Sequence, residues 1–336
     1  LYVDPANLHS GLEYEISEVL CDGHNVTDVL NLSSRSLKTQ LIRCCEGQID
    51  TVVLGSSRPL LLGSDNLQTR TLNLAVSGGT LYDVIGLYQR VCENRSLLEP
   101  LERLIISVEP WFFYHDSSLN RWKFFRRDID NWKNKSPIQV PFISFHKYFQ
   151  LISPSYFQAS IRELIDPSDT GGVEFTITCD KQNKHMTYHA DGTIEYSEKY
   201  RSITPEIVEL RVREDMTTAQ HESLRNKSID PELRQDFDRF LKELNEQAFH
   251  EKKIEVVLLL IPFHPMVYKD NVVKSKTPFL EEVEALTRSK AREFSFMVVG
   301  SYDPQKAGME HMDFYDGIHL SQAGLEKFLN LPVEHP

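Results

Sequence analysis

The chain has 336 residues, of which 40% are hydrophobic and 26% charged, and its formal net charge is −12 at pH 7. Its length allows a substantial core, and the acidic charge argues against nucleic acid or an anionic membrane surface as the main partner. No stretch comes near the roughly 18 uninterrupted apolar residues of a membrane span. Because the chain begins with Leu1 rather than methionine, a signal peptide or membrane anchor upstream of Leu1 is compatible with the sequence.

The N-terminal part of the chain is predicted to precede the main domain as an arm and a first helix. Residues 1–32 are weakly patterned and rich in Asn, Asp and Gly, which indicates an arm lying on the domain. A helix is predicted over residues 37–45. We therefore divide the chain into an N-terminal arm and first helix at 1–49 and a large domain at 50–336.

The five cysteines show neither the spacing of a metal site nor the density of a disulfide scaffold. We interpret them as buried free thiols, which leaves the compartment open. Neighbouring Cys44 and Cys45 are not expected to bond to each other. The five residues are Cys21, Cys44, Cys45, Cys92 and Cys179.

Five short apolar runs end in small or turn-forming residues, and each is predicted to be a strand. Such runs are typical of strands buried on both faces, and therefore of a parallel sheet covered by helices. The predicted strands are 50–54, 72–76, 104–108, 254–261 and 294–299, and the predicted helices are 80–92, 230–248, one beginning at 277, and 321–329. This alternation predicts a three-layer α/β/α fold with a flavodoxin-like, five-stranded parallel sheet.

One segment interrupts the alternation, and we interpret it as an insertion near 112–205, between the third and fourth strands. Period-two patterns at 173–179 and 185–200, the second containing the turn dipeptide Asp191-Gly192, predict strands and a hairpin. With 141–165 before them, they form a mixed helix and hairpin unit. Aromatic residues at its entrance either pack the insertion against the core or form a wall for a carbohydrate or acyl group. They are Trp111, Phe112, Phe113, Tyr114, Trp122, Phe124, Phe125 and Trp132.

Two turns that follow the first two predicted strands could carry chemistry. The motif Gly55-Ser56-Ser57 places a hydroxyl at the carboxyl edge of the sheet, where ligands of open α/β sheets bind. Ser57 is expected to stand at a helix N-terminus, where N–H groups can stabilise an oxyanion. A phosphate-binding or purely structural turn explains this motif equally well. In the second motif, Ser77-Gly78-Gly79-Thr80, glycine lets the backbone approach a ligand.

The third motif is Asp316-Gly317-Ile318-His319, in a loop before the last predicted helix. Here the aspartate can accept a hydrogen bond from the imidazole and fix its tautomer, which leaves the other ring nitrogen facing a nucleophile. Asp313 is the competing candidate for the acid. A lone Asp-x-x-His is often a surface turn, but three such motifs in this order indicate a serine-type site.

Together the three motifs resemble those of the SGNH/GDSL hydrolase superfamily, over residues 50–80 and 250–330. The resemblance implies that Ser57 is the nucleophile, with Ser56 in place of the usual aspartate, and that Asp316 and His319 are the acid and base. The domain at 50–336 would then be SGNH hydrolase-like and interrupted by the insertion. Neither a cofactor nor a metal is expected.

The resemblance also implies an oxyanion hole made by the N–H groups of Ser57 and Gly78. One block departs from the family pattern, because the asparagine that usually follows the third strand is missing from Ser107-Val108-Glu109-Pro110-Trp111. Losing one such donor can cost about 10²–10³ in rate. Trp111 could donate through its indole N–H, whereas ionised Glu109 cannot donate.

Four side chains near the predicted catalytic edge are candidates for substrate binding. Arg58 could hold either an anionic substrate group or a carboxylate such as Glu109. His264, just after the fourth predicted strand, is either a substrate-binding residue or a hydrogen-bonded loop histidine. Glu109 and Trp111 complete the set.

We therefore expect a serine-dependent esterase or O-acyltransferase that acts on an acylated small molecule or carbohydrate. The Gly-Ser-Ser-Arg form, the opening Val3-Asp4-Pro5 and the long insertion are similar to membrane-anchored bacterial envelope members, which implies a cell-envelope carbohydrate and an extracytoplasmic location. A cytoplasmic location stays open. The alternative is a catalytically weak or silent glycan-binding or scaffold protein, motivated by the missing asparagine and the aromatic insertion.

Overall fold

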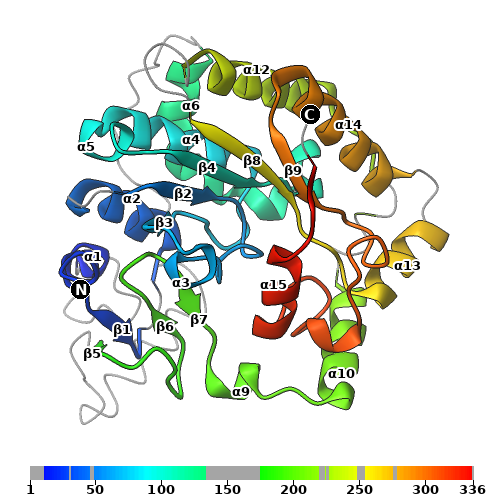
Figure 1. Ribbon diagram of the computed structural model, residues 1–336, viewed down its shortest axis with the longest axis horizontal. Helices are drawn as coiled ribbons and strands as arrows, with labels where there is room; N and C mark the ends of the chain where they lie inside the picture. The colour runs from blue at the N-terminus through cyan, green and yellow to red at the C-terminus, as the bar shows by residue number, and fades with distance from the viewer. Residues whose placement is uncertain are drawn as a thin grey trace.

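The structure is a computed structural model that describes residues 11–334 apart from 30–31, 46–48, 134–174, 219–223, 225–226, 248–253 and 275–277. The predicted segment 141–165 and the opening Val3-Asp4-Pro5 lie outside the described residues. Helices and strands alternate along the chain, and the strands form two sheets. The protein is therefore of the expected mixed α/β class (Figure 1). No helix within the described ranges is both long and apolar enough to cross a membrane.

The larger sheet has six strands in the order β10-β9-β8-β4-β2-β3. Each of the five predicted apolar runs contributes one strand, and these five strands pair in parallel. Their bounds are β2 Thr51–Leu54, β3 Thr71–Asn73, β4 Arg103–Ser107, β8 Glu255–Leu260 and β9 Met297–Gly300. The sixth strand, β10 (Val333–Glu334), was not predicted. It pairs antiparallel with β9 through its backbone and is too short to show a side-chain pattern.

Helices follow the predicted positions because local capping residues define their ends. Ser33 caps one helix by accepting from the Ser36 N–H at 3.4 Å, and Ser321 caps another by accepting from the Gly324 N–H at 3.1 Å. The predicted helices are observed as α2 Ser34–Cys44, α4 Leu81–Glu93, α12 Pro231–Gln247, α14 Phe279–Phe294 and α15 Gln322–Leu329. Other helical elements are α1 Leu12–Cys21, α3 Ser64–Leu67, α5 Arg95–Leu98, α6 Arg126–Trp132, α9 Glu198–Arg201, α10 Pro205–Met216, α13 Pro265–Lys274 and the 3₁₀ turns η1 Pro110–Phe113, η2 Ser117–Phe125 and η4 His311–Asp313.

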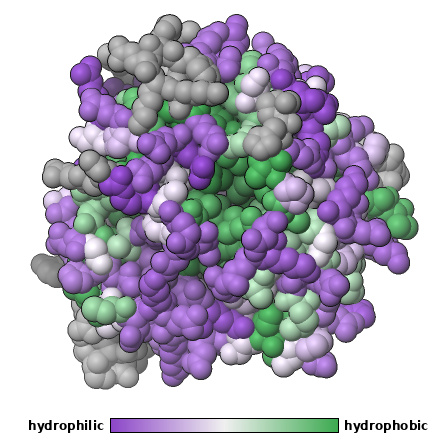
Figure 2. All heavy atoms as spheres, viewed as in Figure 1, coloured by the Kyte–Doolittle hydropathy of each residue, from purple (hydrophilic) through white to green (hydrophobic). Residues whose placement is uncertain are grey.

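Alternate side chains of the larger sheet point into two separate hydrophobic cores. On β2, Val52 and Leu54 belong to the larger core and Val53 to the smaller one. Apolar residues of α2, α4, α12 and α14 cover the larger core, whereas α15 and the loop before it cover the smaller one. Figure 2 shows hydrophobic residues gathered near the centre of the face turned to the viewer, framed by hydrophilic ones. The strands are therefore apolar on both faces, as their sequence predicts.

The smaller sheet joins the N-terminal segment to the insertion. Its order is β5-β1-β6-β7, and all its pairings are antiparallel. The segment predicted as an arm supplies β1 (Asn25–Thr27), and the insertion supplies β5 (Thr176–Thr178), β6 (Thr187–Tyr188) and β7 (Ile194–Glu195). The predicted hairpin is confirmed, but the strand pattern read to residue 200 is wrong at its end, where α9 begins.

The turn of this hairpin docks on the edge of the larger sheet. The N–H of Asn73 in β3 donates to the carbonyl of Asp191 at 2.7 Å. Gly192 has φ of +80°, and a side chain there would collide with the Asn73 carbonyl. Lys38 of α2, which is buried, donates to the carbonyls of Asn73 and Gly192. A glycine turn and a buried lysine therefore fasten the insertion to the main sheet.

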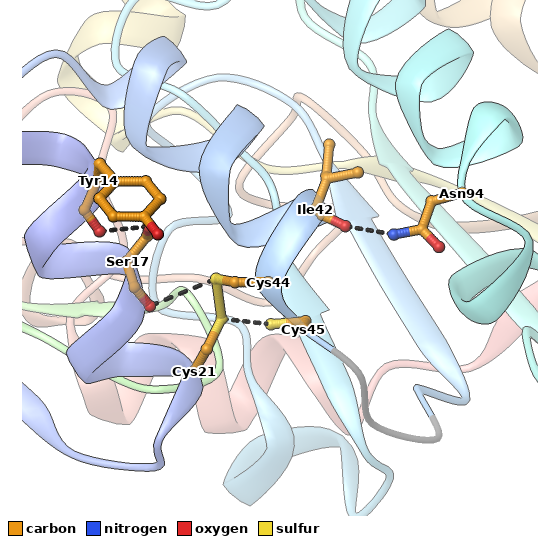
Figure 3. Close-up of a disulfide and its surroundings, with 7 residues drawn as sticks. All are labelled: Tyr14, Ser17, Cys21, Ile42, Cys44, Cys45 and Asn94. Atoms are coloured by element: carbon orange, nitrogen blue, oxygen red, sulfur yellow. Dashed lines mark hydrogen bonds between the residues drawn. A yellow bond between two sulfur atoms is a disulfide. The ribbon is translucent and has the colours of Figure 1, made fainter.

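The prediction that all five cysteines are free thiols is wrong. Cys21, at the end of α1, forms a disulfide with Cys44, at the end of α2 (Figure 3). Cys45, Cys92 and Cys179 form no disulfide among the described residues, Cys179 is exposed rather than buried, and the sulfur of Cys45 lies 3.3 Å from that of Cys21. Spacing could not reveal this pair, because the packing of α1 on α2 brings the two residues together.

Candidate active site

Ser57 lies in the turn that follows β2, at the carboxyl edge of the larger sheet, as predicted. Gly55 has φ of +154°, and any side chain there would collide with neighbouring side chains. The expectation that Ser57 stands at a helix N-terminus is wrong, because the next helix begins only at Ser64. The buried amide of Asn73 explains the irregular turn, since it donates to the Pro59 carbonyl at 2.7 Å.

The structure brings Ser57, His319 and Asp316 together in one chain of hydrogen bonds. Nε2 of His319 lies 2.8 Å from Oγ of Ser57, and Nδ1 lies 2.7 Å from Oδ2 of Asp316. Oδ1 of Asp316 accepts from the backbone N–H groups of Ile318 and His319, both at 2.8 Å. With an ionised aspartate, Nδ1 carries the imidazole proton, so Nε2 is left to accept the proton of the serine hydroxyl.

The charges within this loop favour an ionised acid and a basic histidine. Burial would raise the pKa of Asp316, but His319, Tyr200 and the Ile318 N–H together hold that pKa well below its ordinary value. Burial also lowers the pKa of His319, but the Asp316 carboxylate outweighs this effect and the pKa is raised. Proton transfer from a serine hydroxyl needs a base of this kind.

Gly78 lies in the turn between β3 and α4, next to the turn of Ser57. Its φ of +59° is a left-handed conformation, and a side chain on Gly79 would collide with the Gly55 carbonyl. Thr80 is the N-cap of α4, so the positive end of that helix faces the turn. Within the described ranges, the N–H groups of Ser57 and Gly78 donate to no acceptor. Both are therefore available to an oxyanion.

Arg35 of α2 braces this turn, a contact that the sequence did not predict. Its guanidinium donates to both carboxylate oxygens of buried Asp83, at 2.6 and 2.8 Å. It also donates to the carbonyls of Ser77 and Gly78, each at 3.3 Å. The Ser77 carbonyl and the Gly78 N–H belong to one planar peptide, so this bond fixes the direction of the N–H.

Arg58 and Glu109 form a buried ion pair, which is the second of the two predicted alternatives for Arg58. Nη1 of Arg58 lies 3.1 Å from Oε2 of Glu109, and both side chains are 0% exposed. Glu109 also accepts from the hydroxyls of Ser56 at 2.9 Å and Ser107 at 2.7 Å, and Arg58 donates to the Ile318 carbonyl at 3.1 Å. Burial keeps both side chains from a substrate, so their predicted binding role does not hold. They instead tie the nucleophile turn to β4 and to the acid–base loop.

Trp111 and His264 are likewise engaged in internal contacts. The Trp111 indole donates to the Gly79 carbonyl at 2.9 Å, so it does not point to an oxyanion. Nε2 of His264 lies 2.8 Å from Nδ1 of His311, and Nδ1 of His264 accepts from the Met266 N–H at 3.1 Å. Burial, with a smaller effect of His311, lowers the pKa of His264 to about 4. Neither residue therefore has the predicted role in substrate binding. Trp111 donates to the backbone, and His264 is a neutral, hydrogen-bonded loop histidine.

Two further expectations concern the surroundings of the site. Asp313 does not compete for His319, because its carboxylate accepts from Lys327 at 2.8 Å and from the Glu310 N–H at 2.7 Å. The aromatic residues at the insertion entrance lie in the larger core or pack against it, which agrees with the packing interpretation. In the part of the chain that the structure describes, no three His, Cys, Asp or Glu side chains are grouped as a metal site requires.

The acid–base loop is contacted by one residue of the insertion, Tyr200, and by one residue of α10, Asp215, neither of which the sequence predicted. Tyr200 donates its hydroxyl to Oδ2 of Asp316. Asp215 accepts from the Gly317 N–H at 2.8 Å, and burial raises the Asp215 pKa to about 6. Each of these partners is more than 100 residues away from the loop along the chain, at separations of 116 and 102. No local pattern could have indicated them.

The chain matches no protein-family model and no curated protein. The functional interpretation therefore depends on the geometry of the site itself. A serine hydroxyl bonded to a carboxylate-paired histidine, beside two available N–H groups, can attack a carbonyl carbon and stabilise the resulting oxyanion.

Proposed function

We propose that this protein is a serine-dependent esterase or O-acyltransferase of the SGNH/GDSL type. One observation carries the proposal: the hydrogen bonds from Ser57 through His319 to Asp316, at 2.8 and 2.7 Å. A structural turn would not require a histidine whose pKa is raised by a carboxylate on one nitrogen while the other faces a serine hydroxyl. The neighbouring glycine turn at Gly78 supports the same function.

In the proposed mechanism, His319 takes the proton of Ser57 as Oγ attacks the carbonyl carbon of an ester. The carbonyl oxygen becomes an oxyanion and is received by the N–H groups of Ser57 and Gly78. His319 then gives its proton to the departing alkoxide, which leaves the acyl group on Ser57. Water or a sugar hydroxyl, deprotonated by His319, attacks the acyl carbon; the bond to Oγ breaks, His319 returns the proton to Ser57, and the acid or the acylated sugar is released. Hydrolysis and transfer differ only in this acceptor.

The order of the core strands supports the proposal. Without the edge strand β10, the order β3-β2-β4-β8-β9 reads 2-1-3-4-5 along the chain, the order of flavodoxin-like sheets. We infer a three-layer α/β/α fold of this kind, with the insertion between β4 and β8. Ligands of such sheets bind beyond the carboxyl ends of the strands, where the turns of Ser57 and Gly78 both lie.

We further propose an acylated carbohydrate of the cell envelope as the substrate, and an extracytoplasmic location. The net charge of −12 disfavours a polyanionic substrate and suits a neutral sugar ester. The Cys21–Cys44 disulfide supports an oxidising compartment, because such bonds are rare where thiols are kept reduced.

The decisive experiment compares the wild type with Ser57→Ala on an activated acetyl ester. We expect the substitution to lower kcat by at least about 10³-fold, since the nucleophile is lost while the fold stays intact. Ser96→Ala, which removes an exposed hydroxyl from α5, is the matched control and keeps wild-type activity. Activity that persists in Ser57→Ala would refute the assigned nucleophile.

A glycan-binding or scaffold protein without turnover is the second candidate, and the missing third oxyanion donor favours it. Glu109 occupies the position of the usual asparagine block and is ion-paired, and the Trp111 indole is bonded elsewhere. Labelling with an organophosphonate discriminates the two functions, because only an activated serine reacts. Glycan binding without labelling of Ser57 would support this second function.

A further inference from the structure

The acid of the proposed triad receives a hydrogen bond from outside the core of the fold. Tyr200, in α9, donates its phenolic hydroxyl to Oδ2 of Asp316. The same oxygen accepts from Nδ1 of His319 at 2.7 Å, so the tyrosine and the histidine share one acceptor atom. In Figure 1, α9 and α10 run along the lower edge of the molecule, and α10 contacts η4 and α13.

Tyr200 is held from several sides, so its hydroxyl has a defined direction. The guanidinium of Arg211 lies 4.4 Å from the centre of the Tyr200 ring and donates to the Tyr200 carbonyl at 2.8 Å. The rings of Tyr196 and Tyr315 pack against it, with centroids 4.7 and 5.4 Å away. A side chain restrained in this way can orient its hydrogen-bond partner.

Helix α10, which follows α9 along the chain, also holds the backbone on both sides of Asp316. Asp215, in α10, accepts from the Gly317 N–H at 2.8 Å. On the other side of Asp316, Arg211 of the same helix donates to the Tyr315 carbonyl at 3.3 Å. The acid–base loop is therefore fixed between the core of the fold and the helices α9 and α10.

We propose that Tyr200 is a positioning residue through which the insertion orients the carboxylate of Asp316 toward His319. This inference rests on the proposed function. The phenolic hydrogen bond restrains the carboxyl group and disperses part of its negative charge. Without the hydroxyl, more of that charge acts on the imidazolium, so the pKa of His319 rises. The other charged groups that act on His319, Arg58 and Asp215, keep their positions.

The test uses Tyr200→Phe in the full chain, which removes the hydroxyl and keeps the packed ring. Tyr196→Phe is the matched control, because its ring centroid lies 6.1 Å from that of His319. The pKa of His319 is measured by NMR titration of the imidazole. We expect a rise of about 0.5–1 pH unit in Tyr200→Phe, the size of one hydrogen bond, and no change in Tyr196→Phe. An unchanged pKa in Tyr200→Phe, or an equal rise in the control, overturns the proposal.

Kinetics give a second readout that a purely structural role would not reproduce. The acidic limb of kcat/KM should move to higher pH in Tyr200→Phe, and kcat should fall by about tenfold with little change in KM, because only proton transfer is disturbed. A change in KM alone contradicts the positioning role.

The NMR titration does not depend on turnover. A wild-type protein that neither hydrolyses esters nor reacts with the organophosphonate at Ser57 therefore refutes the proposed function. The effect of Tyr200→Phe on the pKa of His319 can still be measured in that case.

Discussion

At the scale of single residues, Asp316 organises the candidate site. It accepts four hydrogen bonds, from the Tyr200 hydroxyl, the His319 ring and the backbone N–H groups of Ile318 and His319. These donors stabilise the charged form of the carboxyl group and so lower its pKa, and the resulting carboxylate favours the protonated form of the neighbouring imidazole. Asp316 is therefore the main group that raises the pKa of His319 against the opposing effect of burial.

The first consequence concerns the dependence of activity on pH. His319 acts as a base only when neutral, and its pKa is raised above 6.5 in the fold, so kcat/KM should increase with pH through that raised value. Asp316→Asn removes the charge that raises the pKa and leaves burial and Arg58 to lower it. We expect the acidic limb to move to lower pH and kcat to fall by about 10⁴-fold. Steady-state kinetics between about pH 5 and 9 check this, and an unmoved acidic limb contradicts it.

At the scale of elements, the docking of the β6–β7 hairpin on β3 depends on a buried lysine. Lys38 donates to the carbonyls of Asn73 and Gly192, which join the main sheet to the insertion. Burial lowers the pKa of Lys38 to about 7, and Asp191 offsets this only in part. The folded protein therefore holds this amine largely neutral at pH values where the unfolded chain holds it charged.

This difference predicts how stability depends on pH. Between the folded pKa of about 7 and the ordinary value of 10.5, the unfolded chain binds one proton more than the folded protein. The free energy of unfolding should therefore gain about 1.4 kcal/mol for each pH unit in that range. Lys38→Met should remove this contribution, whereas Lys306→Met, at an exposed position, should keep it. Urea unfolding at about pH 7 and 9 measures the difference, and parallel curves for the wild type and Lys38→Met would contradict the prediction.

At the scale of the whole molecule, the N-terminal segment is an integral part of the fold. Its strand β1 is the second strand of the smaller sheet, between β5 and β6 of the insertion. Its helix α1 packs on α2 and is joined to it by the Cys21–Cys44 disulfide. The segment thus connects the insertion to the helices that cover the larger core.

Loss of this disulfide should therefore destabilise the protein as a whole. The bond closes a loop with a sequence separation of 23, for which the chain-entropy model gives about 3 kcal/mol. We expect Cys21→Ser to lower the free energy of unfolding by about this amount, measured by urea denaturation. Cys45→Ser is the matched control, and it should behave as the wild type. If instead Cys45→Ser is as destabilised as Cys21→Ser, the partner of Cys21 is Cys45, whose sulfur lies 3.3 Å away.

Those features that depend on local sequence were predictable. The five apolar runs became parallel strands because a strand with both faces in a core must be apolar at every position. The Asp191-Gly192 turn also formed as predicted, because turn formation involves residues only a few positions apart. The three motifs of Ser57, Gly78 and His319 could be found since each follows a strand or precedes a helix.

Contacts between distant segments were decided only by the tertiary structure. Whether Arg58 meets a substrate or Glu109 depends on how β2 and β4 lie side by side. The burial of the Arg58–Glu109 ion pair cannot be predicted from either residue alone. The same holds for the Cys21–Cys44 bond and for the Arg35 contact with the glycine turn. Tyr200 and Asp316 are 116 residues apart in the sequence, and the residues next to Tyr200 do not indicate that Asp316 is its hydrogen-bond partner. Local sequence determined the elements and the reactive motifs, while packing between remote segments determined which polar groups meet and which are buried.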